Sequence, residues 1–172
     1  MEFAIKNKWI SLGGSSVVQD TSGNDVMKVK GKIFSFTQKK FLTDLNDNVK
    51  FIIRNKFWRL FTYRAFILDP EEKVVATVRR KIFSLHDRYF VTSDLGDMEI
   101  IGNIFQFNYK ILLNGKEIGH VARKISLRDS YVLTADDDYD PMFMVALVIA
   151  VDNITDRKDQ NNAAFFSSSS SN

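Results

Sequence analysis

The residues best suited to binding chemistry in this chain are basic, and they recur at matching positions of a repeated pattern. The densest group is Arg79, Arg80 and Lys81. Alternate residues of a strand share one face, so part of the basic set is expected to point outward together. The residues predicted to share this outward face are Lys30, Lys32, Arg79, Lys81 and Lys124. Such a face binds phosphates of lipid head groups or nucleic acid, or it only keeps exposed strands from pairing with other chains.

Two arginines are expected on the opposite, apolar face of the strands. Arg80 and Arg123 occupy equivalent repeat positions at which the alternating pattern is otherwise hydrophobic. A buried charge needs a partner, and the acids considered for this role stand just before the last apolar segment. They are Asp136, Asp138 and Asp140. The pattern therefore predicts a structural role for Arg80, Arg123, Asp138 and Asp140 in docking that segment.

The acidic turn also has the alternation of a calcium-binding loop. Asp136, Asp138 and Asp140 stand at alternate positions, as in the first half of an EF-hand loop. That loop requires glycine at its sixth position and glutamate at its twelfth, and these positions hold Pro141 and Leu147. Capping of a helix N-terminus explains the acids without a metal. No metal site is therefore expected.

The chain offers little for catalysis. His86 and His120 have no spacing that suggests a metal pair, and there is no cysteine. The Gly13-Gly14 turn lacks the lysine of a phosphate-binding loop. No arrangement of nucleophile, acid and base stands out. The sequence predicts a protein that is not an enzyme and needs no cofactor.

The charge is divided unevenly along the 172 residues, which carry a formal net charge of +3. Residues 1–134 hold 22 basic and 14 acidic residues, whereas residues 135–172 hold 2 and 7. A basic body attracts phosphate groups, but nucleic acid is disfavoured as a partner because no base-stacking platform is evident. The apolar run Pro141–Val151 is too short for a membrane span of ~20 residues. A cytoplasmic protein is expected.

The elements that position these residues are read from a short repeated phrase: a basic residue, large apolar residues, often a serine, then Leu or Phe. Copies begin at Lys8, Lys32, Lys56, Lys81 and Lys124, with a degenerate copy at residues 102–105. The steps between the lysines are 24, 24, 25 and 43 residues. A repeat of this length marks one supersecondary unit that is used again and again. Each unit holds a short apolar strand, a turn signal such as Asn114-Gly115 and a longer strand, and so predicts a β-hairpin.

Successive hairpins predict a closed antiparallel β-barrel of about twelve strands, because closure removes the exposed sheet edges. A barrel of that size needs something in its interior. The candidate is a central helix over residues 141–154, which is apolar on all sides and begins with Asp140 as N-cap and Pro141 in the first turn. The domain is expected to span 1–154, and the polar segment 155–172 is expected to be a disordered tail.

The order of these features resembles the LURP-one-related family in its small, single-domain, bacterial-type form. The resemblance rests on the string of hairpins, the repeated phrase, the segment NYKILLNGKEIGHVARK and the acidic turn that leads into MFMVALVIAVDNI. The family belongs to a superfamily with the tubby C-terminal domain and the phospholipid scramblases. The resemblance implies a twelve-stranded barrel around a central C-terminal helix. Tubby-like members bind phosphoinositide head groups, scramblase members are linked to lipid movement and calcium, and no catalytic residue set defines the family.

The interpretation that follows is a non-enzymatic binding or scaffolding domain. Its expected partner is an anionic phospholipid surface on the cytoplasmic side of a membrane, or another protein. The alternative is a small-molecule-binding barrel, or an enzyme of unrecognised type, with a pocket at one barrel mouth. A nucleic-acid-binding or regulatory module is the weakest alternative.

Overall fold

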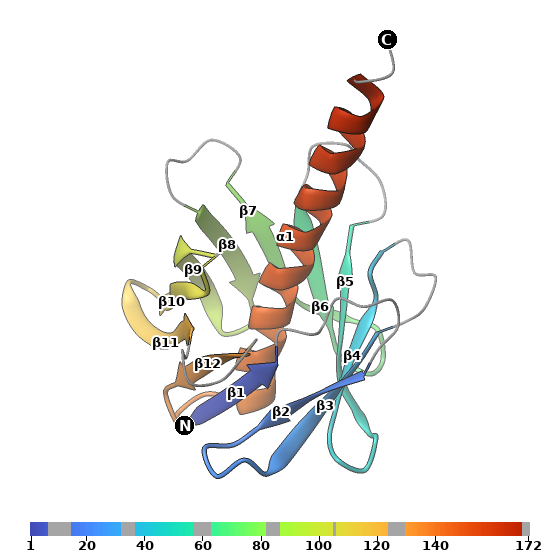
Figure 1. Cartoon of the computed structure of the whole chain (residues 1–172). Coiled ribbons are helices and arrows are strands. Elements are labelled where there is room, and N and C mark those ends of the chain that lie inside the picture. Colours follow the sequence, from blue (N-terminus) through green and yellow to red (C-terminus); the bar gives the residue numbers. More distant parts are fainter. Residues whose placement is uncertain are drawn as a thin grey trace.

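The computed structural model shows twelve strands that close into a barrel around one helix (Figure 1). It describes residues 1–6, 15–31, 37–56, 63–81, 87–104, 106–123 and 130–169, with side chains omitted at Lys6, Ser15, Ser130 and 156–169. The elements are β1 (Glu2–Lys6), β2 (Ser15–Gln19), β3 (Asp25–Gly31), β4 (Lys40–Thr43), β5 (Val49–Asn55), β6 (Arg64–Leu68), β7 (Val74–Arg80), β8 (Asp87–Ser93), β9 (Gly96–Asn103), β10 (Asn108–Leu113), β11 (Lys116–Arg123), β12 (Ser130–Ala135) and α1 (Pro141–Ser169). The predicted fold class is confirmed.

Every strand is antiparallel to both of its neighbours, and the barrel closes where β1 pairs with β12. At the closure, Phe3 lies opposite Leu133 and Ile5 opposite Tyr131. All four of these side chains are buried. The alternation seen in the sequence is therefore an alternation between the barrel interior and its outer surface.

Aspartate side chains fix the β2–β3 and β4–β5 turns. Asp20 Oδ1 accepts hydrogen bonds from the backbone N–H groups of Ser22 and Asn24, each 2.9 Å long. Asp44 makes the same pair of contacts in the β4–β5 turn. The side-chain amides of Asn24 and Asn48 hold the pKa of Asp20 and Asp44, respectively, below its ordinary value. In each of these turns, hydrogen bonds to one aspartate side chain hold the backbone conformation.

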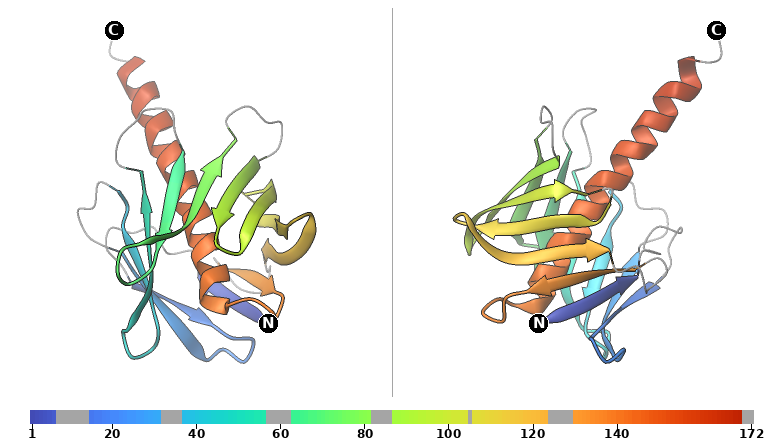
Figure 2. Two further views of the ribbon diagram at one scale, coloured as in Figure 1. Left: turned by 180° about the vertical axis from the view of Figure 1, so that it is seen from behind. Right: turned by 60° about the vertical axis from the view of Figure 1, so that its left-hand side comes forward.

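The recurring phrase lies almost entirely outside the described residues, in the segments 7–14, 32–36, 57–62, 82–86, 105 and 124–129. The interpretation that its aromatic residues pack on the helix or between strands therefore stays a prediction. Each segment follows an odd-numbered strand, and these strands all end at the same end of an antiparallel barrel. We call this end the helix-exit end, because α1 leaves the barrel there (Figures 1 and 2).

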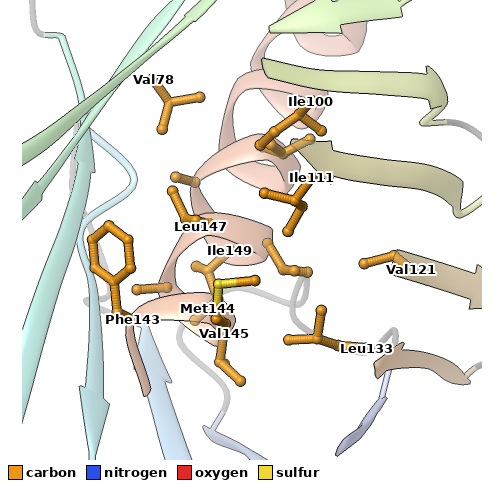
Figure 3. Close-up of a cluster of buried hydrophobic side chains, with 14 of the residues drawn as sticks. Val78, Ile100, Ile111, Val121, Leu133, Phe143, Met144, Val145, Leu147 and Ile149 are labelled. Carbon is orange, nitrogen blue, oxygen red and sulfur yellow. The ribbon is translucent and has the colours of Figure 1, made fainter. Parts of the chain in front are cut away.

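The barrel interior is filled by the first part of α1. Its side chains from Phe143 to Ile154 are all buried. Figure 3 shows Leu147, Met144 and their neighbours surrounded by side chains that point inward from the strands. The helix is apolar all round because strands surround it on every side. Gly119 on β11 leaves room for the Met144 side chain, since a Cβ at that position would lie 2.7 Å from Met144 Cε.

The helix is longer than the sequence pattern predicts. It continues to Ser169 and projects from the barrel (Figure 2), so residues 155–169, expected to be disordered, have helical backbone. Extending an existing helix costs far less than starting one, and this segment contains neither Pro nor Gly. Within the described residues, no helix is long and apolar enough to cross a membrane.

Candidate functional site

The outer wall of β5, β6 and β7 is basic. These three strands contain lysine and arginine but no acidic residue. Inward side chains such as Ile53, Ala65 and Val78 are buried, which places the alternate residues on the outside. Six cations gather toward the helix-exit end on this wall and on β8. We call them the basic face: Arg54, Lys56, Arg64, Arg79, Lys81 and Arg88.

Several of these cations are directly opposed across neighbouring strands. Arg64 on β6 is the register partner of Arg79 on β7. On the other side of Arg64, the Lys56 N–H donates to the Arg64 carbonyl oxygen at 2.9 Å. Likewise, the Lys81 N–H donates to the Arg88 carbonyl oxygen at 2.8 Å. The sheet therefore lines up cations in adjacent positions instead of alternating them with acids.

Like charges in opposed positions destabilise a sheet, so this arrangement needs a compensating partner. Arg88 has one on β9, with 3.8 Å between its Nε and Glu99 Oε2. Arg54 lies over the ring of Phe66, 5.3 Å from its centroid. Arg64 differs, because its Nε is buried without an acceptor in the described part of the chain. A buried donor without an acceptor costs stability.

Among the described members of the predicted outward set, Lys30 lies apart from Arg79 and Lys81. Lys30 lies on β3, and β4, β5 and β6 separate it from Arg79 on β7. Its Nζ is 2.9 Å from Asp47 Oδ1, which also pairs with Lys28 at 2.9 Å. These two lysines hold the pKa of Asp47 below its ordinary value. Lys32 and Lys124 lie outside the described residues, and Arg79 and Lys81 are both exposed.

The repeat carried a signal for part of the basic face. Arg54 and Lys56 follow Lys30 and Lys32 by 24 residues and precede Arg79 and Lys81 by 25 residues. They are the third copy of the same basic pair. Arg64 carries no such signal by itself, since its importance comes from lying between two neighbours that are distant in sequence.

Arg80 and Arg123, the two arginines predicted to point inward, differ in burial, and Arg80 has a different partner from the one predicted. Arg80 is largely buried, but its Nη2 donates to Asp87 Oδ1 at 2.8 Å, and it lies 5.9 Å from the ring centroid of Tyr63. This pair lies at the helix-exit end, whereas the acidic turn lies at the opposite end. Arg123 is exposed. Pairing of Arg80 with the acidic turn is therefore corrected to pairing with Asp87, the first residue of the adjacent strand.

At the helix-exit end, polar side chains hold α1 in place. Lys40 on β4 and Asp152 on α1 form an ion pair, with 3.2 Å between Nζ and Oδ2. The Asn55 Nδ2 group donates to the Asn153 carbonyl oxygen at 2.9 Å and to Gln38 Oε1 at 2.6 Å. These polar contacts lie where the buried apolar stretch of the helix ends, and they link the helix to β4 and β5.

Two buried tyrosines lie at the same level. The hydroxyl groups of Tyr89 and Thr155 are 3.1 Å apart. Burial is the main cause that raises the pKa of Tyr89 to about 12 and the pKa of Tyr109 well above its ordinary value, and the charge of Asp152 adds to both. Both tyrosines are therefore kept neutral, and their role in this region is structural.

The acidic turn has the geometry of a helix cap. Asp140 Oδ1 accepts a hydrogen bond from the Met142 N–H at 2.8 Å. Asp136 Oδ1 accepts a longer one from the Asp138 N–H at 3.3 Å, and Lys116 Nζ is 3.6 Å from Asp136 Oδ2. The Asp138 side chain is exposed. Among the described residues, no group of His, Asp and Glu is arranged to hold a metal ion.

A groove of about 440 Å³ lies beside the basic face, on the outer wall of the barrel. It extends across β7, β8, β9 and β10, and Arg79 belongs both to its lining and to the basic face. The small-molecule alternative placed a pocket at a barrel mouth. This groove is instead a feature of the wall, separated from the interior by the sheet.

The architecture defines the class first: a twelve-stranded antiparallel barrel threaded by its own C-terminal helix. The chain belongs to the LURP-one-related family, whose model matches residues 1–152. A similar fold occurs in a protein of Arabidopsis thaliana solved by X-ray crystallography, with a TM-score of 0.66, 19% sequence identity and coverage of 90% of each chain. At that identity, the likeness concerns the fold alone. A search of curated proteins found no match.

Proposed function

We propose that this protein is a non-enzymatic binding domain that engages anionic phospholipid head groups at the cytoplasmic surface of a membrane. The observation that carries the proposal is the opposition of Arg64 and Arg79 on adjacent strands. Both residues belong to the outer wall, and guanidinium groups bind phosphate oxygens through paired N–H donors. Membrane leaflets rich in anionic lipid attract such clusters.

The shape of the basic face supports a surface as the partner. Its cations lie on the outer wall of four neighbouring strands, so they face the same side of the barrel. Arg79 and Lys81 are exposed, and Arg88 keeps 39% of its side-chain exposure. A lipid surface presents many phosphates in one plane and contacts such a set together.

The test is co-sedimentation with phosphatidylcholine vesicles that contain or lack phosphatidylglycerol. Wild-type protein should bind the anionic vesicles and release them as salt is raised. The variant Arg64→Gln/Arg79→Gln/Lys81→Gln should bind about a hundredfold more weakly, at about 1 kcal/mol for each cation near the surface. Absence of wild-type binding would end the proposal.

A matched control separates this site from net charge. Lys30→Gln/Lys50→Gln/Lys116→Gln removes the same number of charges from positions outside the basic face. We expect this control to bind within about threefold of wild type, since its lysines lie on other strands or at the turn end. Equal losses in the two variants would show that attraction follows overall charge and not the basic face.

A further inference from the structure

The groove beside the basic face carries charges of both signs in one cross-strand row. Arg79 on β7 is the register partner of Phe90 on β8, and Phe90 is the partner of Glu99 on β9. Glu99 is in turn the partner of Leu112 on β10. All four line the groove. The row thus runs from a cation, across an aromatic ring, to a carboxylate and an apolar side chain.

A second cross-strand row adds another carboxylate beside Glu99 on β9. We call the side of the groove that holds these two carboxylates the acidic wall. Asp97 on β9 is the register partner of Thr92 on β8, and both line the groove. The β10–β11 turn, Asn114-Gly115, closes this end, and both residues have positive φ, 50° and 81°. The polar groups around this wall are carboxylate, hydroxyl and amide groups, which accept hydrogen bonds from a cationic or hydroxyl-bearing ligand.

The separation of the charges defines the length of the ligand. Arg79 and Glu99 lie two strands apart, so their backbones are about 10 Å from each other. Both side chains are long enough to shorten the span between their charged groups. A ligand that satisfies both walls therefore carries an anion and a cation a few bonds apart, joined by a short apolar link that lies on the ring of Phe90.

A ligand with a single type of charge fits less well. A purely anionic group at Arg79 would extend toward the carboxylates of Asp97 and Glu99, where it is repelled. A purely cationic group would meet Arg79, with Arg64 directly beside it. Charge complementarity along the groove selects a zwitterion.

We propose that this groove binds the phosphoethanolamine head group of an aminophospholipid, an inference that rests on the proposed lipid-binding function. The Arg79 guanidinium donates to the phosphate oxygens. The primary ammonium donates to the carboxylates of Asp97 and Glu99, while Arg88, 3.8 Å from Glu99, keeps that carboxylate at the rim. The two methylene groups of the head group cover Phe90. The basic face then contacts the anionic lipids around this one.

The experiment compares two sets of vesicles with the same fraction of phosphatidylglycerol. In one set the remaining lipid is phosphatidylcholine, and in the other it is phosphatidylethanolamine. We expect about tenfold tighter binding to the second set, because a primary ammonium donates charge-assisted hydrogen bonds that a quaternary ammonium lacks. Equal binding to both sets would overturn this inference and leave the proposed function standing, whereas absence of binding to either set would overturn the proposed function.

Variants place the effect in the groove. Asp97→Asn/Glu99→Gln should abolish the preference for phosphatidylethanolamine and keep binding to phosphatidylglycerol. The control Glu71→Gln/Asp138→Asn removes two exposed acids from other turns and should keep the preference. A preference that survives Asp97→Asn/Glu99→Gln would refute the groove as its source.

A titration with a soluble head-group compound distinguishes a membrane lipid from a free head group as the ligand. Glycerophosphoethanolamine, titrated into wild-type protein and followed by NMR, should shift the Phe90 ring signals weakly, and it should compete with vesicles only at high concentration. Tight binding of this soluble compound together with no preference among vesicles would overturn the lipid as the source of the ligand.

Discussion

Lys40 on β4 and Asp152 on α1 form a buried ion pair across the point where the helix leaves the barrel, with 3.2 Å between Nζ and Oδ2. Each side chain keeps only 9% of its exposure. Asp152 is the one charged residue in the sequence between Pro141 and Thr155. This pair links the helix to β4, and the hydrogen bond from Asn55 to the Asn153 carbonyl oxygen links the next helical residue to β5. Because the buried contacts further down the helix are apolar and tolerate sliding, these polar contacts set how far the helix is inserted.

Replacing one partner of this pair should destabilise the protein strongly. Asp152→Ala removes the carboxylate that pairs with the buried Lys40 ammonium, so the free energy of unfolding should fall by about 3–5 kcal/mol. Urea denaturation followed by circular dichroism measures this change. The double variant Lys40→Met/Asp152→Leu should recover most of the loss, because an apolar pair of similar volume needs no desolvation of charge.

An exposed ion pair serves as the control for that prediction. Lys110 Nζ and Glu117 Oε2 are 2.7 Å apart on the outer surface. Lys110→Ala should cost less than about 1 kcal/mol. If Asp152→Ala cost no more than Lys110→Ala, the buried pair would not be what positions the helix.

The buried Tyr89 should make the protein sensitive to high pH. Burial raises the pKa of Tyr89 to about 12 in the folded state, against 10.0 for an exposed tyrosine. Below pH 10 the Tyr89 hydroxyl group keeps its proton in both the folded and the unfolded state, so its ionisation does not change the stability. Between pH 10 and 12 the unfolded state loses the proton first, so stability falls as pH rises, by up to about 3 kcal/mol.

Tyr89→Phe isolates this contribution. At neutral pH the variant should be about 1 kcal/mol less stable than wild type, since it loses the contact of the hydroxyl group with Thr155. Toward pH 12 the order should reverse. Urea denaturation at several pH values measures the two curves, and parallel curves would show that Tyr89 ionises as an exposed tyrosine does.

The fold was predictable because its signals are local and repeated. Alternating residues such as those of β3, turns such as Asn114-Gly115 and an apolar segment at 141–151 each follow from short-range chemistry. Closure then follows from the number of strands and the need to cover sheet edges. The length of α1 was not predictable in the same way, because a polar sequence does not reveal that a preceding buried helix continues into it.

The basic face was predictable only in part, for a geometric reason. The repeat places Arg54 and Arg79 at equivalent positions of β5 and β7, which the sequence spacing reveals. Whether such residues merge into one surface depends on the strand between them, and that strand supplies Arg64. Lys30 has the same spacing but forms an ion pair with Asp47, a turn residue 17 positions further on. Pairing between strands decides which equivalent positions share a surface.

The opposition of Arg64 and Arg79 should have a measurable cost to folding. Arg79→Thr removes one of the two charges and introduces a β-branched residue that suits a strand. In low salt, without lipid, this variant should be more stable than wild type by about 0.2–1 kcal/mol, and the gain should vanish at high salt. The same variant should bind anionic vesicles more weakly.

Lys30→Thr is the matched control: it breaks an ion pair with Asp47, so it should give no gain in stability. A low-salt loss of stability in Arg79→Thr, as large as that of the control, would mean that Arg79 stabilises the barrel and is not held there for binding.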